Sequence, residues 1–208
     1  MGTEAALRAP LVQWGVAARA FPGEPVSGDR HLVQPFPLGV LIAVVDGLGH
    51  GTEAAAAADT AVRVLAEHAD ESIIPLVRRC HDALKRTRGV VLSLASFDAR
   101  GATMTWLGVG NVEGVFFHGD GGSGLVRETL LQRGGVVGFQ LPSLRAAVLP
   151  VSQGDLLLFL TDGIQSSFIQ GIPLTAAPQL MADHLLARYG KTSDDALILV
   201  ARYLGGGP

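Results

Sequence analysis

The chain has 208 residues, of which 48% are hydrophobic and 17% are charged, and its formal net charge is −3. A chain of this length buries about 70% of the surface of its unfolded form, so it can fold without a metal or a disulfide. Cys80 is the only cysteine, which excludes an intrachain disulfide framework and a thiolate zinc cluster. No block of Lys or Arg marks a nucleic-acid surface. We expect one globular domain over residues 1–208, with its core from about 12 to 203.

Signals for export or membrane insertion are not found. The first ten residues, MGTEAALRAP, lack the basic and apolar regions of a signal peptide. The apolar runs are far shorter than the roughly 20 residues that span a bilayer. We expect a cytoplasmic protein without membrane contact.

The first expected elements are two strands separated by a loop. Residues 12–20 can form a strand, and residues 21–29 (FPGEPVSGD) are predicted to be a loop, because each proline fixes φ and the glycines allow turns. Residues 38–45 are apolar throughout, which is typical of a central strand buried on both faces.

Two helices are predicted next. Residues 52–69 are rich in alanine and carry larger apolar residues at three- and four-residue spacing, with Thr52 as a candidate N-cap. Residues 72–87 are predicted to form the second helix, in which Pro75 is tolerated because it lies in the first turn.

The periodicity then changes to that of strands joined by short turns. The predicted strands are 90–97, 102–109, 112–118, 124–131, 144–151, 155–160 and 196–203, with a glycine-rich loop at 134–142 and a helix at 176–189. Adjacent strands without intervening helices favour antiparallel pairing over βαβ crossovers. The predicted fold class is α+β, with a central antiparallel β-sandwich flanked by helices.

Four acidic sites stand at the ends of the expected central strands. VVDG places Asp46 after one apolar strand, and LLLFLTDG places Asp162 after another. TSDD, residues 192–195, precedes the last strand, and SGD, which ends at Asp29, precedes the strand at 38–45. Because antiparallel neighbours bring such ends to one edge of a sheet, we expect these carboxylates to lie close together.

Clustered carboxylates favour a divalent cation. They cannot all stay ionised in a site of low dielectric constant without positive charge nearby. The ligands on offer are oxygens, which suit Mg²⁺ or Mn²⁺ better than zinc. Each element alone has a plainer interpretation, since an Asp-Gly pair after a strand is usually a turn. The signal is the ordered set of four.

This ordered set resembles the metal-dependent PPM/PP2C-type serine/threonine phosphatases, and their bacterial SpoIIE-like branch in particular. The motifs that carry the resemblance are SGD, VVDGLGHG with its Ala-rich helix, LLLFLTDG and DDALILV. The resemblance implies a β-sandwich flanked by helices and two Mn²⁺ or Mg²⁺ ions. It also implies a metal-activated water that attacks phosphoserine or phosphothreonine.

By position in these motifs, the resemblance implies a set of metal ligands. Asp46 would bridge both ions and the Gly47 carbonyl would bind one of them, while Asp162 and Asp194 would hold the other. Asp29 would sit beside the first ion, directly or through water. The choice of Asp194 over Asp195 rests on the motif alignment alone.

Within the branch, the compact length and the wording SGDR, DGLGHG and GVGNVEG look like the stand-alone RsbX-type phosphatases of the stressosome. That likeness implies a monomer acting on phosphorylated STAS-domain proteins of the RsbS or RsbR kind. The alternatives are an RsbU/SpoIIE-type phosphatase of an anti-anti-sigma factor, and a catalytically weak PPM-fold binding or scaffold module.

The chain also departs from the family pattern. Animal-type members carry a histidine two residues after the bridging Asp, where this chain has Leu48, so His50 is the candidate general acid. A structural turn residue is an equally good interpretation of His50. Glu24 stands at the spacing of the phosphate-gripping arginine of the eukaryotic enzymes, and Arg30 is a weak candidate for substrate binding in its place.

One competing motif remains. GLGHG between a strand and a helix approximates a dinucleotide-binding turn, in which bare glycines let a pyrophosphate approach a helix N-terminus. Thr52 occupies the third glycine position, and a second helix follows instead of a parallel strand, so this match is weak.

Overall fold

The computed structural model describes residues 10–119 and 125–205, and within them ten strands form two antiparallel five-stranded sheets. The first sheet has the order β1-β10-β9-β6-β7 and the second has the order β2-β3-β4-β5-β8. The strands of the first sheet are β1 (Val12–Arg19), β6 (Glu113–Gly119), β7 (Leu125–Leu130), β9 (Leu156–Leu160) and β10 (Ala196–Tyr203). Those of the second are β2 (Asp29–Phe36), β3 (Gly39–Gly47), β4 (Val90–Asp98), β5 (Thr103–Val109) and β8 (Ala147–Pro150).

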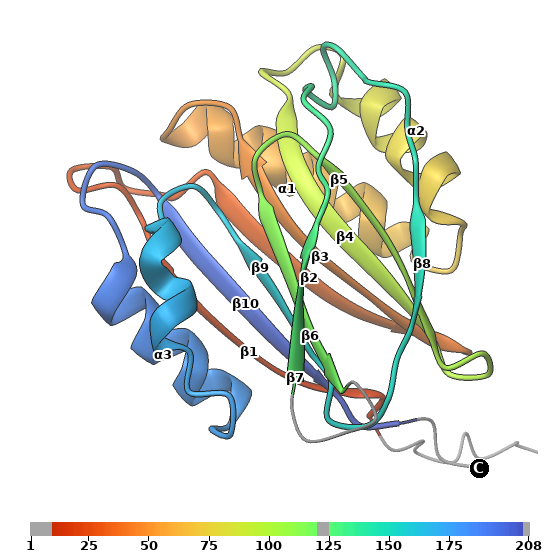
Figure 1. Ribbon diagram of the computed structural model, residues 1–208. Helices are drawn as coiled ribbons and strands as arrows, with labels where there is room; N and C mark the ends of the chain where they lie inside the picture. Colours follow the sequence, from red (N-terminus) through yellow and green to blue (C-terminus); the bar gives the residue numbers. More distant parts are fainter. Residues whose placement is uncertain (1–9, 120–124, 206–208) are drawn as a thin grey trace, which may run out of the picture.

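Helices cover the outer face of each sheet, which confirms the predicted α-β-β-α sandwich. Helices α1 (Thr52–Glu67) and α2 (Ile73–Leu84) lie against the second sheet, whereas α3 (Pro178–Tyr189) lies against the first (Figure 1). A short 3₁₀ helix, η1 (Ser166–Gly171), precedes α3. None of the helices in the described ranges is long and apolar enough to cross a membrane.

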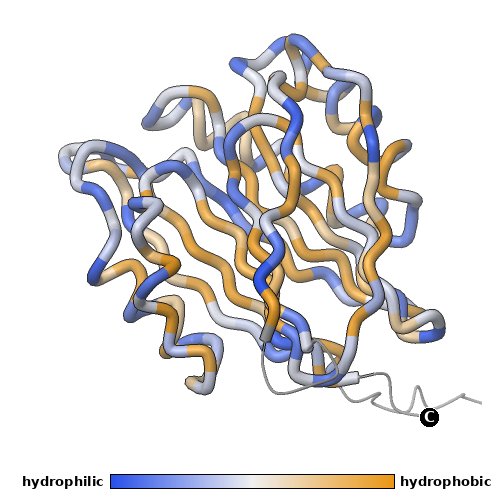
Figure 2. The backbone as a smooth tube through the Cα atoms, in the orientation of Figure 1, coloured by the Kyte–Doolittle hydropathy of each residue, from blue (hydrophilic) through white to orange (hydrophobic). Residues whose placement is uncertain are grey.

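Three apolar layers hold the sandwich together. One lies between α1, α2 and the second sheet, one between the two sheets, and one between the first sheet and α3. The central strands β3 and β10 contribute to the middle layer from one face and to an outer layer from the other, so almost every residue is buried. Figure 2 shows apolar residues along the strands and hydrophilic residues in the connections at their ends.

The structure differs from the sequence prediction at three elements. Strand β2 was not predicted, because its half-buried residues alternate little and Pro35 interrupts the pattern. Pro35 is tolerated because β2 is an edge strand. The N-cap of α1 is Gly51 and not Thr52, and the predicted strand 144–151 shortens to β8. The predicted hairpin loop at 119–123 lies mostly outside the described residues.

Candidate metal centre and catalytic site

Two carboxylates face each other where β2 begins and β3 ends. The antiparallel register pairs Asp29 of β2 directly with Asp46 of β3. Side chains at paired positions lie on one face of the sheet with Cβ atoms about 5 Å apart, and like charges in this arrangement repel. The pair therefore needs compensation that neither residue gives the other.

Both carboxyl groups hold their protons unusually tightly without a cation. Burial raises the pKa of Asp46 to about 8, and the neighbouring Asp29 carboxylate adds to the effect. Burial likewise raises the pKa of Asp29 to about 7, although a hydrogen bond from Thr161 opposes the shift. Within residues 10–119 and 125–205, the Asp46 side chain has no hydrogen-bond partner. A carboxylate in this setting favours a positive charge beside it.

Thr161 ties the two sheets together at this edge. Its hydroxyl donates to Oδ2 of Asp29 at 2.8 Å and accepts from the backbone N–H of Leu197 at 2.9 Å. Thr161 follows β9 and Leu197 lies in β10, so both belong to the first sheet, whereas Asp29 belongs to the second. This bond brings the end of β9, and with it Asp162, to the Asp29–Asp46 pair.

The two adjacent aspartates before β10 have different surroundings. Both oxygens of the buried Asp195 accept backbone hydrogen bonds, from Phe21 N–H at 2.7 Å and from Gly28 N–H at 2.7 Å. Asp195 therefore holds the loop of residues 21–28, the proline-rich loop, against the edge of the two sheets. We call this edge, which carries Asp29, Asp46, Asp162 and Asp194, the rim. The half-buried Asp194 uses Oδ1 to accept from the N–H of Asp195, and its pKa is raised, mainly by burial. This geometry leaves Oδ2 of Asp194 for an external ligand.

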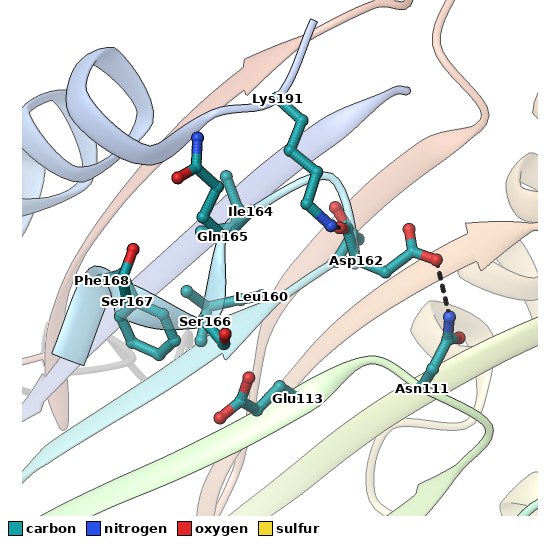
Figure 3. A pocket seen from close by; sticks show the side chains of 11 residues that line it. Asn111, Glu113, Leu160, Asp162, Ile164, Gln165, Ser166, Ser167, Phe168 and Lys191 are labelled. Atoms are coloured by element: carbon teal, nitrogen blue, oxygen red, sulfur yellow. Dashed lines mark hydrogen bonds between the residues drawn. The ribbon is translucent and has the colours of Figure 1, made fainter. Parts of the chain in front are cut away.

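Asp162 is exposed at the junction of two hollows. Its Oδ2 accepts a hydrogen bond from Nδ2 of Asn111 at 2.8 Å, and its backbone carbonyl accepts one from Nζ of Lys191 at 2.5 Å. Figure 3 shows Asn111 and Asp162 pointing toward one another beside a hollow of about 440 Å³. Polar and apolar side chains line that hollow, including Glu113, Gln165 and Ser166.

The second hollow, of about 400 Å³, collects the predicted site residues. Asp46, His50, Asp162 and Asp194 all line it, together with Phe21. Residues from the ends of β3 and β9, the start of α1 and the loop before β10 thus converge on one space. Asp46, Asp162 and Asp194 belong to the acidic sites that were expected to lie close together, and Asp29 stands next to them through its pairing with Asp46.

Arg30 lies beside this group with its guanidinium already engaged. Nε donates to Oδ1 of Asp59 at 2.6 Å, and Nη1 donates to the backbone carbonyls of Ser27 at 2.7 Å and Asp29 at 2.9 Å. Substrate binding by Arg30 stays a prediction, and it would require these contacts to be released.

The rim fits a hard cation bound through few protein ligands. Its donors are carboxylate and carbonyl oxygens, which suit Mg²⁺ or Mn²⁺. Among the residues that the structure describes, no group of three or more His, Cys, Asp or Glu side chains is placed so that it could hold a metal ion by itself. Mg²⁺ usually keeps several waters and binds through one or two carboxylates, so an open rim suits it.

Four contributors to the site were not predicted from the sequence in the roles that the structure shows. Asn111 and Thr161 orient Asp162 and Asp29, Asp195 holds the loop, and Glu24 contacts His50. Asn111 and Thr161 stand in the quoted stretches GVGNVEG and LLLFLTDG, so the motifs contained the signal. The Glu24 contact spans 26 positions and left no local pattern.

Comparison with known proteins finds one family. Residues 37–204 match the family model described as Stage II sporulation protein E (SpoIIE). Asp46, Asp162 and Asp194 lie inside the matched segment, whereas Asp29 lies before it. The phosphoserine phosphatase RsbX of Bacillus subtilis strain 168 is 27% identical over 101 residues, which are 49% of this chain and 51% of that protein. The match thus spans about half the length of this curated relative.

Two solved structures share the fold over nearly their whole length. One comes from work on the bacterial stressosome as a modular system adapted to control secondary messenger signalling. It has a TM-score of 0.82 and 29% identity, and the match covers 92% of this chain and 99% of that chain. The other is RsbX in complex with magnesium, with a TM-score of 0.81, 21% identity and coverage of 92% and 95%.

Proposed function

The chain belongs to the SpoIIE family, and from this membership and the carboxylate rim we propose that it is a metal-dependent phosphatase of phosphoserine and phosphothreonine in proteins. The observation that carries the proposal is the convergence of Asp29, Asp46, Asp162 and Asp194 from two sheets on one edge. Similarity to the phosphoserine phosphatase RsbX supports the same activity.

The proposed cofactor is a pair of Mn²⁺ or Mg²⁺ ions. Asp46, Asp29 and the Gly47 carbonyl would hold one ion, Asp162 and Asp194 would hold the other, and Asp46 would bridge them. Bound ions of this kind lower the pKa of a water and neutralise charge on the phosphate. The magnesium complex of RsbX supports a divalent cation as the cofactor.

The chain's own residues would hold this arrangement in place. Thr161 keeps Asp29 aimed at the rim, Asn111 does the same for Asp162, and Asp195 secures the loop that carries Asp29. The hollow of about 440 Å³ beside Asp162 is where we place the polypeptide on one side of the phosphorylated residue.

The proposed substrates are phosphorylated STAS-domain proteins of the RsbS or RsbR kind, which the monomeric enzyme would dephosphorylate in the cytoplasm. The relatives that support this proposal are RsbX and the structure from work on the stressosome. An anti-anti-sigma factor is the alternative substrate, and the two are distinguished by offering each phosphoprotein separately.

A direct test is hydrolysis of p-nitrophenyl phosphate and of phosphorylated STAS protein, with Mn²⁺ and with EDTA. We expect turnover only with the metal, and a loss of roughly 100-fold or more in the variant Asp46→Asn. Asp70→Asn is the matched control, because Asp70 is an exposed carboxylate outside the rim. Folded protein without metal-dependent turnover on any phosphoprotein would instead support the binding-module alternative.

A further inference from the structure

A carboxylate from the proline-rich loop holds the imidazole of His50. Nδ1 of His50 lies 2.6 Å from Oε1 of Glu24. Because a carboxylate oxygen only accepts hydrogen bonds, Nδ1 must carry the hydrogen. The ring of Phe21 lies against the imidazole, with 5.4 Å between centroids and 41° between planes. Glu24 thus contacts one edge of the imidazole, and Phe21 packs against the ring.

The backbone of the DGLGHG turn leaves space for this contact. Gly51 has φ +77°, a conformation that L side chains rarely adopt. A Cβ at Gly51 would lie 2.7 Å from Oε2 of Glu24. Any larger residue would push the carboxylate away from His50.

Stability alone gives little reason for the pair. The His50 side chain is 58% exposed, and ion pairs at exposed positions contribute about 0–1 kcal/mol. A contact of that kind, next to a position where only glycine fits without strain, points to a role for the position of the ring.

The position is the edge of the candidate catalytic hollow. His50 lines that hollow with Asp46, Asp162 and Asp194. Its second nitrogen, Nε2, makes no hydrogen bond to any described residue. Histidine is also the side chain type in this lining that most often serves as a general acid. Leu48, two residues after Asp46, has no proton to give.

We propose that Glu24 is a positioning residue, which holds His50 so that its Nε2–H protonates the serine oxygen as that oxygen leaves phosphorus. The inference rests on the proposed phosphatase function and adds the group that aims the acid. It also assigns a role to the glutamate that stands where the eukaryotic enzymes have an arginine.

The step balances as a simple hydrolysis. A water oxygen forms a bond to phosphorus while the bond from phosphorus to the serine Oγ breaks. The electron pair of the broken bond stays on Oγ, which takes the proton from Nε2 of the His50 imidazolium, the form that carries a hydrogen on both nitrogens. The neutral imidazole keeps its Nδ1 hydrogen and its bond to Glu24. The water gives up one proton, and solvent returns one to Nε2, so that serine and inorganic phosphate are the products.

The test compares leaving groups of different basicity. An alkoxide such as serine needs a proton to leave, whereas p-nitrophenolate leaves readily as an anion. We expect His50→Gln to lower kcat on a phosphoserine peptide by roughly 100-fold. The same variant should lower kcat on p-nitrophenyl phosphate by only a few-fold. Equal losses on both substrates would overturn the proposal, because a merely structural residue affects both alike.

Variants of Glu24 test the positioning role. Glu24→Ala should lower kcat on the phosphoserine peptide by about 10-fold, as part of the acid's contribution, with little change in KM. Glu24→Gln keeps an acceptor oxygen and should recover most of that loss. In the His50→Gln background, Glu24→Ala should add nothing. Additive losses would contradict a shared role.

NMR of the imidazole tests the contact between Glu24 and His50 without a measurement of catalysis. Long-range ¹H–¹⁵N spectra of wild-type protein should show neutral His50 as the Nδ1–H tautomer, and Glu24→Ala should average the two tautomers. A wild-type Nε2–H tautomer would overturn the proposal. His68→Gln is the matched control for His50→Gln in the kinetic test. His68 also faces a glutamate, Glu71, at 3.4 Å, but it lies outside the hollow.

Different results would contradict the phosphatase activity and the role of Glu24. Wild-type protein that hydrolyses neither substrate with metal contradicts the proposed function, whatever the NMR spectra show. Wild-type protein that hydrolyses both, with His50→Gln equally impaired on both, contradicts only the inference about Glu24 and His50.

Discussion

At the scale of single residues, the site depends on groups that would repel each other in isolation. Asp29 and Asp46 are paired across neighbouring strands, and both have strongly raised pKa values. The hydroxyl of Thr161 is the one side chain among the described residues that hydrogen-bonds to the Asp29 carboxylate. It satisfies the backbone N–H of Leu197 as well.

Thr161→Val should therefore destabilise the protein by about 1–3 kcal/mol, because it leaves a buried N–H and a buried carboxylate without their partner. Urea unfolding of the metal-free protein measures the change. Thr60→Val is the control, since its hydroxyl bonds only to the carbonyl of Ala56 on an exposed part of α1. Equal effects of the two variants would argue against the role of Thr161.

At the scale of elements, glycines set how closely a helix approaches a strand. Gly15 of β1 lies directly under the first turn of α3, and a Cβ there would be 2.3 Å from backbone atoms of Gln179. Gly47 at the end of β3 meets α1 in the same way, with a Cβ position 2.1 Å from the carbonyl of Ala54. Both helices pack at distances that an alanine would increase.

Gly15→Ala should push α3 from the first sheet and lower the free energy of unfolding by about 1–3 kcal/mol. Gly15 pairs with Val200 in the middle of β10 and not with the start of that strand, next to Asp194 and Asp195, so the folded variant should retain metal-dependent activity. Gly119→Ala is the control, because no atom of residues 10–117 or 125–205 lies within 4 Å of a Cβ at that position. A Gly15→Ala protein as stable as wild type would show that α3 adjusts without loss.

At the scale of the whole molecule, the raised pKa values of Asp29 and Asp46 link stability to pH and to metal. In the unfolded chain both carboxyls have the ordinary value of 3.8, whereas in the folded, metal-free protein the values are about 7 and about 8. At pH values between 3.8 and about 8, the folded state therefore binds more protons than the unfolded state. Its stability therefore falls as pH rises from about 4 to about 8.

We expect the metal-free protein to have a lower Tm at pH 8 than at pH 6, with this contribution fully present only below the unfolded pKa. Added Mn²⁺ or Mg²⁺ should raise the Tm more at pH 8, where the carboxylates are ionised and free to bind. Thermal unfolding with EDTA and with metal at both pH values measures this. The pH dependence should shrink in Asp46→Asn, and an unchanged dependence would contradict its origin at the rim.

The sequence by itself determined the fold class and the positions of the acidic groups. Apolar runs such as β3, β9 and β10 have the length and composition of buried strands, and a carboxylate stands at the end of β3, after β9 and before β10. These features are local, because burial of a strand and the turn after it depend on neighbouring residues. The ordered motifs also predicted the family, and the match over residues 37–204 confirms that prediction.

Only the tertiary structure decided which groups meet. Strand β2 is stabilised by pairing with β3 and not by its own pattern, so its half-polar sequence did not reveal it. Asp194 and Asp195 are alike in sequence, and their roles separate through contacts with a loop more than 160 residues away. The bond between Glu24 and His50 likewise exists because the proline-rich loop folds over the start of α1. Contacts between distant segments follow from packing of the whole chain, and a local pattern does not contain them.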